Sequence, residues 1–487
     1  MATAVDLVGV HGTRNTALAT PGHAPVGKLA TRVAGRIEAD IVRRGWPAGE
    51  SLGSEVDLRE QYGVSRAVLR EAVRLVEHHQ VARMQRGPGG GLLIVRPDAG
   101  PATRASVIYL EYLGTSVEDV LAVRLLLEPL AVQLAADRIT EDGIARLRRA
   151  LAAEAERGAP GMWSHDPLHV VLGELSGNSV LRLFIDVLTR LTNRYAHQAH
   201  QLPPTELAAA RSSGRRWHAS IVEAVIAGDA ARAQTRMSDY LDTITAWLDE
   251  HGSGPGAGPE AGPAGGPPRP AGAKEKLAEI MADRIHQDIV RQGWPVGQVL
   301  GSETGLLDRY QVSRAVLREA VRLLEYHAVA RMRRGPGGGL IVAEPEAQAS
   351  IETMALYLQY QHGTGEDLRL VREAIELGTV AGVTARRDEP QVAGWLATAA
   401  RFSPADRFHG ELAQLAGNPV LVLFLRILSE LFRRHIAGQG VPLPPADVIG
   451  QVAQAHQRIL DAIVAGDGCL ARHRMRRHLA ALTPWWH

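Results

Sequence analysis

Hydrophobic residues recur at helical spacing near the start of the chain, between Val26 and Arg44. They fall every four residues, on what would be one face of a helix, at Leu29, Val33, Ile37 and Ile41. The turn-forming run Gly45-Trp46-Pro47 follows directly and predicts the end of this helix. A helix with one buried face is therefore expected here.

A short helix, a glycine turn and a longer helix are predicted next. Ser54 is a good N-cap for a helix over residues 55–62, Gly63 supplies the turn, and Ser65 caps a helix that runs to about His79. The apolar face of the longer helix consists of Val68, Leu69, Ala72, Val73 and Val76. Its exposed face carries an arginine every four residues, at Arg66, Arg70 and Arg74. This order of elements is the helix-turn-helix pattern.

Two short strands are predicted after the longer helix, from Val81 to Met84 and from Leu92 to Val95. The segment between them, QRGPGGG, is basic and rich in glycine. A hairpin with a basic, flexible tip beside a helix-turn-helix is typical of a wing.

The chain is an internal repeat. The run SRAVLREAVRL occupies Ser65 to Leu75 and again Ser313 to Leu323, an offset of 248 residues. The glycine-rich segment RGPGGGL repeats at the same offset. Further on, His169 matches His409 at an offset of 240, so the second copy lacks eight residues of a helix-loop segment. Two copies of one architecture are expected.

The second half of each copy has an almost purely helical pattern, which predicts an all-α bundle. The expected fold class is mainly α, with two winged helix-turn-helix domains that carry a small β-wing and two helical-bundle effector domains. The predicted order is a flexible tail (1–24), the first winged-helix domain (25–97), the first helical domain (104–250), a Gly/Pro linker (251–273), the second winged-helix domain (274–345) and the second helical domain (349–487). A flexible linker of this length spans about 25 Å, enough for the copies to dock.

Composition is that of an ordinary globular protein, with 45% hydrophobic and 22% charged residues. There is no long apolar stretch or signal-peptide pattern, and Cys469 is the single cysteine, which together predict a cytoplasmic protein without membrane association. Residues 27–96 carry 12 basic and 8 acidic side chains and residues 274–342 carry 11 and 8, whereas the whole chain is only +1. Positive charge is thus concentrated where DNA phosphates would be met.

The segment GSEVDLREQYGVSRAVLREAVRLVE and the glycine-rich wing after it resemble the GntR regulators, specifically their FadR subfamily. In that family the recognition helix enters the major groove and the wing tip reaches the minor groove. The resemblance implies a double-stranded DNA operator as partner and DNA contacts from Ser65, Arg66, Arg70, Arg86 and Gly87 and their copy-two equivalents Ser313, Arg314, Arg318, Arg334 and Gly335. Val56 and Thr304 stand where the family usually has an arginine, so the preferred sequence is expected to differ from that of relatives.

The helical half of each copy resembles the FCD effector domain of the same subfamily. Many members bind a divalent metal through one aspartate and three histidines, and the metal helps to hold a small carboxylate effector. Such ligands suit Zn, Ni, Fe or Mn. The resemblance implies a site in the second helical domain formed by Asp406, His409, His456 and His478. The first helical domain has a weaker set, Asp166, His169 and His218, because its fourth position is Tyr240 and a tyrosine with a pKa near ~10 coordinates poorly.

An arginine and a glutamate are spaced i, i+4 in each helical domain, Arg124 with Glu128 and Arg372 with Glu376. This spacing predicts an ion pair on a helix surface, worth ~0.3–0.5 kcal/mol. The family resemblance offers an alternative, in which Arg372 and Arg124 face the effector carboxylate.

These features favour a DNA-binding transcription regulator and not an enzyme. Its tandem copies are expected to form an intramolecular pseudo-dimer on an imperfect palindrome, and higher oligomers stay open. One alternative keeps the regulator but gives it a metal-free acyl-CoA or lipid-like effector. A remote alternative is a metal-dependent hydrolase, for which the sequence supplies no obvious general base.

Overall fold

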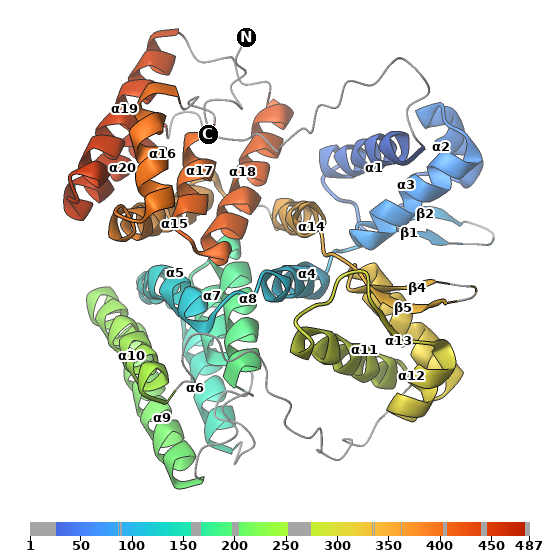
Figure 1. The fold of residues 1–487 in the computed structure, drawn as a ribbon, viewed down its shortest axis with the longest axis horizontal. Coiled ribbons are helices and arrows are strands. Elements are labelled where there is room, and N and C mark those ends of the chain that lie inside the picture. Colours follow the sequence, from blue (N-terminus) through green and yellow to red (C-terminus); the bar gives the residue numbers. More distant parts are fainter. Residues whose placement is uncertain are drawn as a thin grey trace. The chain divides into compact units, whose positions relative to one another are not determined.

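The structure is a computed structural model that describes residues 26–85, 87, 90–156, 167–196, 204–251, 274–333, 335, 337–361, 363–402, 407–439 and 446–482. Over these residues the chain forms twenty helices and five short strands (Figure 1). The predicted fold class, mainly α with two small β-wings, is confirmed. The predicted tail and the linker from residue 252 onward lie outside the described residues.

The first winged-helix domain has the elements that its pattern predicts. They are α1 Val26–Arg43, α2 Glu55–Tyr62, α3 Arg66–His78, β1 Ala82–Gln85 and β2 Gly91–Ile94. The strands pair antiparallel, each shifted by one residue from its predicted position. One predicted core residue is wrong: Leu29 is 36% exposed, and Ala30 is fully buried instead. At about 100° per residue, Leu29 lies about 120° around the helix from Ile41, whereas Ala30 lies only about 20° from it.

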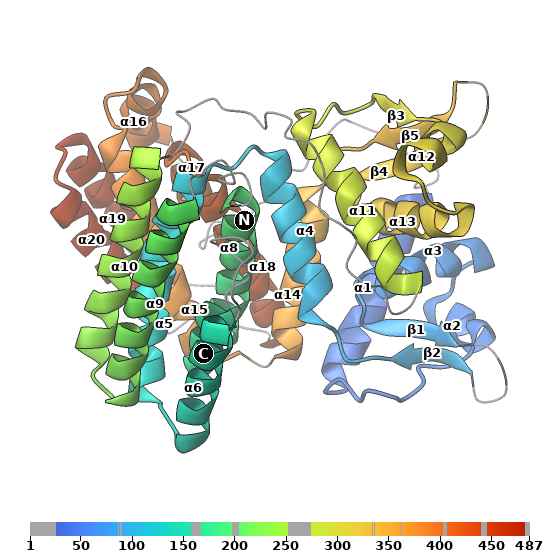
Figure 2. The same cartoon turned by 90° about the horizontal axis from the view of Figure 1, so that it is seen from below.

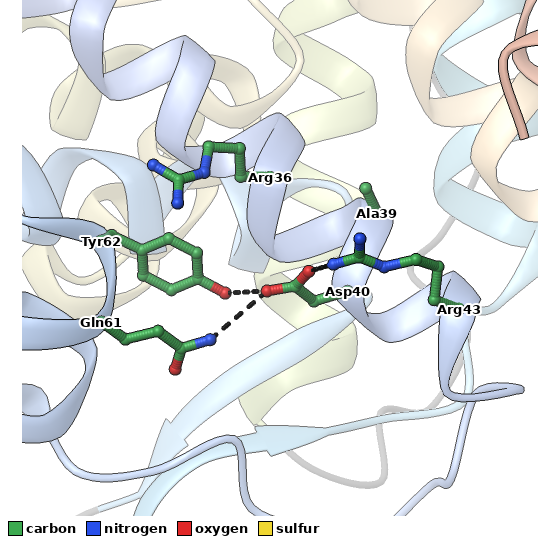
Figure 3. A pocket seen from close by; sticks show the side chains of 6 residues that line it. All are labelled: Arg36, Ala39, Asp40, Arg43, Gln61 and Tyr62. Atoms are coloured by element: carbon green, nitrogen blue, oxygen red, sulfur yellow. Dashed lines mark hydrogen bonds and ion pairs between the residues drawn. The ribbon is translucent and has the colours of Figure 1, made fainter.

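Asp40 ties α1 to α2 in this domain. Its carboxylate accepts hydrogen bonds from the Tyr62 hydroxyl at 2.6 Å and from Gln61 Nε2 at 3.4 Å (Figure 3). These side chains line a hollow of about 390 Å³ together with Arg36 and Arg43. The second copy keeps the tie between the equivalent tyrosine and aspartate at 2.6 Å, so we interpret it as a structural link between the two helices.

The second winged-helix domain repeats this arrangement with one additional strand. Its elements are α11 Lys274–Arg291, β3 Val299–Gly301, α12 Glu303–Tyr310, α13 Arg314–Tyr326, β4 Ala330–Arg333 and β5 Gly339–Val342. The strands form one antiparallel sheet in the order β3-β5-β4. In the first copy, an isolated bridge from Ser51 to Leu93 takes the place of β3.

Both helical domains are all-α, as the pattern predicts. The first contains α4 Ala99–Tyr112, α5 Val117–Asp137, α6 Glu141–Glu156, α7 Pro167–Leu175, α8 Ser179–Ala196, α9 Pro204–Ile226 and α10 Ala230–His251. The second contains α14 Ala347–Tyr360, α15 Gly365–Ala385, α16 Pro390–Phe402, α17 Phe408–Leu415, α18 Pro419–Gln439, α19 Ala446–Val464 and α20 Gly468–Ala481. In each, the second helix begins with a capping box, made by Ser116 and Asp119 or by Thr364 and Asp367.

The chain divides into two compact units, each of which combines parts of both copies. Unit one comprises residues 1–102, 351–417 and 421–487, and unit two comprises residues 103–350 and 418–420. The first winged-helix domain thus shares a unit with the second helical domain. The second winged-helix domain shares a unit with the first helical domain.

Equivalent contacts join the winged-helix domain to a helix of the other copy in each unit. In unit one the ring of Trp46 lies 5.3 Å from that of Tyr360 in α14, and Leu356 of α14 belongs to the winged-helix core. In unit two Trp294 lies 5.6 Å from Tyr112 in α4, and Ile108 of α4 belongs to the core of the second winged-helix domain. Figures 1 and 2 both show α4 beside α11.

Unit two adds a charged network at this junction. Arg194 of α8 forms ion pairs with Glu111 of α4 at 2.8 Å and with Asp283 of α11 at 3.1 Å. His286 of α11 lies 3.3 Å from the same glutamate. Burial raises the pKa of Glu111 to about 7, against the opposing effect of Arg194. The network connects the helical domain to the winged-helix domain of its unit.

Unit one has different chemistry at the equivalent positions. Arg434 Nη1 of α18 donates a hydrogen bond to Gln359 Oε1 of α14 at 3.3 Å. The residue equivalent to His286 is Glu38, which pairs with His79 of its own domain at 2.5 Å. The two junctions share their aromatic contact but differ in their charged groups.

We expect Leu356→Ala to destabilise the first winged-helix domain selectively. Leu356 is 1% exposed, and truncation of a buried leucine costs about 2–5 kcal/mol in the free energy of unfolding. Hydrogen exchange resolved by peptide should accelerate in α1 and α3 and not in α11 and α13. Ile108→Ala is the matched variant and should show the opposite pattern. Equal acceleration in both domains would contradict the crossed contacts.

Candidate nucleic-acid interface and metal centre

The predicted recognition helices expose their arginines beside the start of the preceding helix. In the first copy, Arg66 and Arg70 have side chains 62% and 60% exposed, and both approach Glu55, the first residue of α2. Arg66 Nε donates to Glu55 Oε1 at 2.6 Å, and Arg70 Nε lies 3.5 Å from the same oxygen. The hydrogen bond from Arg66 lowers the pKa of Glu55. A single carboxylate therefore positions two exposed guanidinium groups.

The second copy has the same pair of contacts, but there Arg318 donates the hydrogen bond to the glutamate. Glu303 Oε1 lies 3.4 Å from Arg314 Nε and 3.3 Å from Arg318 Nε. The side chains of these arginines are 61% and 66% exposed. Ser65 and Ser313 cap their helices by accepting a hydrogen bond from the backbone three residues on. The structure thus brings these predicted residues together on one face of each domain. The sequence alone did not indicate Glu55 and Glu303, although the Ser-Glu pair in both copies was an available signal.

The wing lies against the segment that precedes α2. A Cβ atom on Gly91 would approach the carbonyl oxygen of Gly53 to 2.6 Å, and one on Gly339 would approach that of Gly301 to 2.4 Å. Only glycine fits such an approach. The predicted tip residues Gly87 and Gly335 have φ of +107° and +98°. Arg86 and Arg334 lie outside the described residues, and their DNA contacts stay predictions.

Three histidines converge in the second helical domain. His409 of α17, His456 of α19 and His478 of α20 are 1%, 5% and 4% exposed. His478 Nε2 lies 3.1 Å from His456 Nε2 and 3.2 Å from His409 Nε2. Tetrahedral ligands with bonds of ~2.0–2.1 Å lie roughly 3.3 Å apart, so this spacing fits one metal ion. Within the described part of the chain, these residues form the one group with metal-ligand spacing.

Burial keeps His456 and His478 in the form that binds metals. Burial lowers the pKa of His478 to about 3 and that of His456 well below its usual value. Neutral imidazole is the ligating form. The fourth predicted ligand, Asp406, lies outside the described residues and stays a prediction.

A buried carboxylate orients the first of these histidines. Glu376 accepts from His409 Nδ1 at 2.5 Å, which directs Nε2 toward the other two rings. The same glutamate pairs with Arg372 at 2.7 Å. Burial opposes ionisation, but His409 and Arg372 lower the pKa of Glu376 to about 2. Glu376 was predicted only as an ion-pair partner, and the structure adds the contact with the histidine.

The predicted ion pairs form in both copies, but the expectation that they lie on the helix surface is wrong. The side chains of Arg372 and Glu376 are 2% and 0% exposed, and those of Arg124 and Glu128 are 3% and 2% exposed. The reason is that α15 packs against α17, α19 and α20, and α5 packs against α7 to α10. Residues spaced i, i+4 share a face, but the spacing does not say whether that face points to solvent.

The first helical domain keeps the supporting residues and changes one ligand position. Glu128 pairs with Arg124 at 2.6 Å and with His169 Nδ1 at 2.8 Å, as in the second copy. The rings of His169 and His218 lie 5.2 Å apart, and Tyr240 completes the cluster, 5.6 and 4.9 Å from them. Asp166 lies outside the described residues. A tyrosine thus occupies the position of the third histidine.

Comparisons with known proteins agree with these features. The gntR family of bacterial regulatory proteins matches residues 29–91 and 277–339, and the FCD domain family matches residues 119–243 and 346–481. None of the described helices is long and apolar enough to cross a membrane.

Curated relatives correspond in length to about one copy. The HTH-type transcriptional repressor NanR of Salmonella newport (strain SL254) is 26% identical over 243 residues, which cover 44% of this chain and 87% of the relative. The NanR of Salmonella typhimurium (strain LT2) is also 26% identical, with 44% and 86% covered.

Solved structures match over a similar length. The Streptococcus agalactiae GntR structure is 21% identical and covers 45% of this chain and 99% of its own, with a TM-score of 0.31. E. coli McbR/YncC is 17% identical and covers 46% and 97%, with a TM-score of 0.22. On the evidence of the family matches, the chain belongs to the GntR family of bacterial regulatory proteins, as a transcription regulator with two helix-turn-helix and two FCD domains in tandem and not as an enzyme.

Proposed function

We propose that one chain binds one double-stranded DNA operator with both of its winged-helix domains, as an intramolecular pseudo-dimer. The observation that carries this proposal is the crossed contact within each unit. The core of each winged-helix domain includes a residue from the other copy, Leu356 or Ile108. Joining two binding modules in one chain also raises the effective concentration of one near the other, to roughly the millimolar scale for short connections.

Sedimentation with and without operator DNA tests the pseudo-dimer. The chain has a mass of 52.5 kDa, and we expect the free and the DNA-bound protein to contain one chain. A DNA-bound species with two chains at dilute concentration would contradict self-sufficiency.

We further infer that the second helical domain binds a divalent transition metal (Zn, Ni, Fe or Mn) through His409, His456 and His478, with Asp406 as a fourth ligand. Three buried imidazoles at ligand spacing support this site. Coordination positions left open by the protein would accept oxygen atoms of a small carboxylate effector. Arg372 pairs with Glu376, which in turn contacts His409. The positive charge of Arg372 would favour such an anion.

The first helical domain would bind metal more weakly or not at all, since Tyr240 replaces a histidine. Arg124 and Glu128 are retained there with His169 and His218. The metal-free alternative, an acyl-CoA or lipid-like effector, therefore applies more naturally to this domain than to the second. We also propose that the chain belongs to the FadR subfamily of the GntR family.

The crossed units suggest which DNA-binding domain the metal site controls. The second helical domain shares unit one with the first winged-helix domain. Within it, Arg434 of α18 contacts Gln359 of α14, and Leu356 and Tyr360 of α14 contact the winged-helix domain. An effector that binds more tightly to a shifted position of α18 would favour that position. It would thereby change operator affinity through the first winged-helix domain.

A further inference from the structure

The two recognition helices are identical over the part that faces outward. Residues 66–75 and 314–323 have the same sequence, and the first difference, Val76 against Leu324, is buried at 0% and 3% exposure. The first two arginines of each helix have nearly equal exposures, and they contact equivalent glutamates, Glu55 and Glu303. We therefore expect the same major-groove readout from both domains, because both offer the same donors at the same helix positions.

The copies differ at the exposed position that follows the glutamate contacted by these arginines. Val56, which follows Glu55, is 61% exposed. Its equivalent is the exposed Thr304, whose Oγ1 lies 3.1 Å from Ser302 Oγ. Valine can contact a thymine methyl group but cannot hydrogen-bond, whereas threonine can bond a base edge or a phosphate.

A second difference lies at the base of the wing. The last residue of β1 is Gln85, and the last residue of β4 is Arg333, both exposed. They pair with Gly91 and Gly339, the glycines that lie against the segment before α2 or α12. Arg333 Nη2 also donates to the carbonyl of Gly337 in the tip at 2.8 Å. An arginine near a minor groove favours narrow, A·T-rich DNA, and a neutral glutamine does not.

Two of the other differences between α2 and α12 have structural explanations. Asp57 closes the capping box of α2, and Gly305 replaces it in α12. Leu307, which replaces Arg59, packs against the core of the second winged-helix domain. Both changes are therefore accounted for within the domain.

We propose that the operator has two identical core half-sites in the major groove and unequal flanks, with Val56 or Thr304 and Gln85 or Arg333 as the residues that determine the flank preference. The half-site of the second winged-helix domain carries the A·T-rich flank. This inference rests on the DNA-binding function, and it places the imperfection of the palindrome outside the recognition-helix contacts.

Selection of random duplexes by the purified full-length chain tests the proposal. We expect selected sites with matching cores and one A·T-rich flank. The double variant Val56→Thr/Gln85→Arg should select A·T-rich flanks on both sides and bind such a symmetric site about fivefold or more tightly than the wild-type chain does. The reciprocal variant Thr304→Val/Arg333→Gln should lose the flank preference on both sides.

Gln61→Arg is the matched control, because it adds the same charge beside Asp40 and Tyr62 (Figure 3) and copies the second domain's Arg309. It should leave the selected flanks unchanged. Selected half-sites that differ in their cores, or flanks unaffected by either exchange, would overturn the proposal while the DNA-binding function stands. A chain that selects no sequence at all would instead contradict the DNA-binding assignment.

Discussion

His456→Ala is expected to remove the bound metal from the chain. The wild-type protein should hold about one equivalent of divalent metal, because His409, His456 and His478 present three buried Nε2 atoms at ligand spacing. Loss of one of three nitrogen ligands leaves too few to hold the ion at dilute concentration. Elemental analysis of the purified chain after reconstitution measures the stoichiometry directly.

Three further variants sharpen this result. His218→Ala, in the first helical domain, should leave the metal content unchanged. Glu376→Gln should weaken metal binding by about 10–100-fold while all three ligands remain, because Glu376 orients His409. Tyr240→His should add a second equivalent by restoring a three-histidine cluster with His169 and His218. Equal metal in His456→Ala and wild type, with circular dichroism showing both folded, would make the histidines structural.

Arg66→Ala and Arg314→Ala are each expected to weaken operator binding by about 1–3 kcal/mol, or roughly 5- to 150-fold. The losses should be similar, because the two recognition helices are identical over residues 66–75 and 314–323 and each is proposed to serve one half-site. Removal of Arg66 also leaves Glu55 without its closest partner, which adds repulsion between its carboxylate and the DNA. Fluorescence anisotropy at several salt concentrations measures both affinity and the number of phosphate contacts.

Arg36→Ala provides the control for charge alone. Arg36 packs over the ring of Tyr62, in the hollow between α1 and α2 (Figure 3). Its removal should therefore change affinity far less than removal of Arg66. Full retention of affinity in both Arg66→Ala and Arg314→Ala would remove these helices from the DNA interface.

Local elements of this protein followed from the sequence. The bounds of α2 and the caps Ser54 and Ser65 agree with the pattern, because capping and helical periodicity depend on residues within one or two turns. The repeat indicated two copies of each domain for the same reason, because similar sequences form similar local structures. Where the spacing drifted from 3.6 residues, as at Leu29, the assignment of the buried face failed.

The candidate site was only partly accessible from sequence. Family resemblance indicated the three histidines, but His409, His456 and His478 come from three helices and meet only through tertiary packing. The contact of Glu376 with His409 and the burial of its pair with Arg372 depend on which helices surround α15. Helical spacing cannot supply that information.

The crossed pairing of the copies was decided by tertiary structure alone. Tyr112 and Tyr360 occupy equivalent positions in α4 and α14, and Trp46 and Trp294 are equivalent in the winged-helix domains. Each tyrosine would fit either tryptophan chemically, so the sequence is compatible with contacts within a copy or between copies. The sequence by itself determined what each copy contains, because that information is local. Only the packing of segments about 180 to 315 residues apart could determine which winged-helix domain each helical domain contacts.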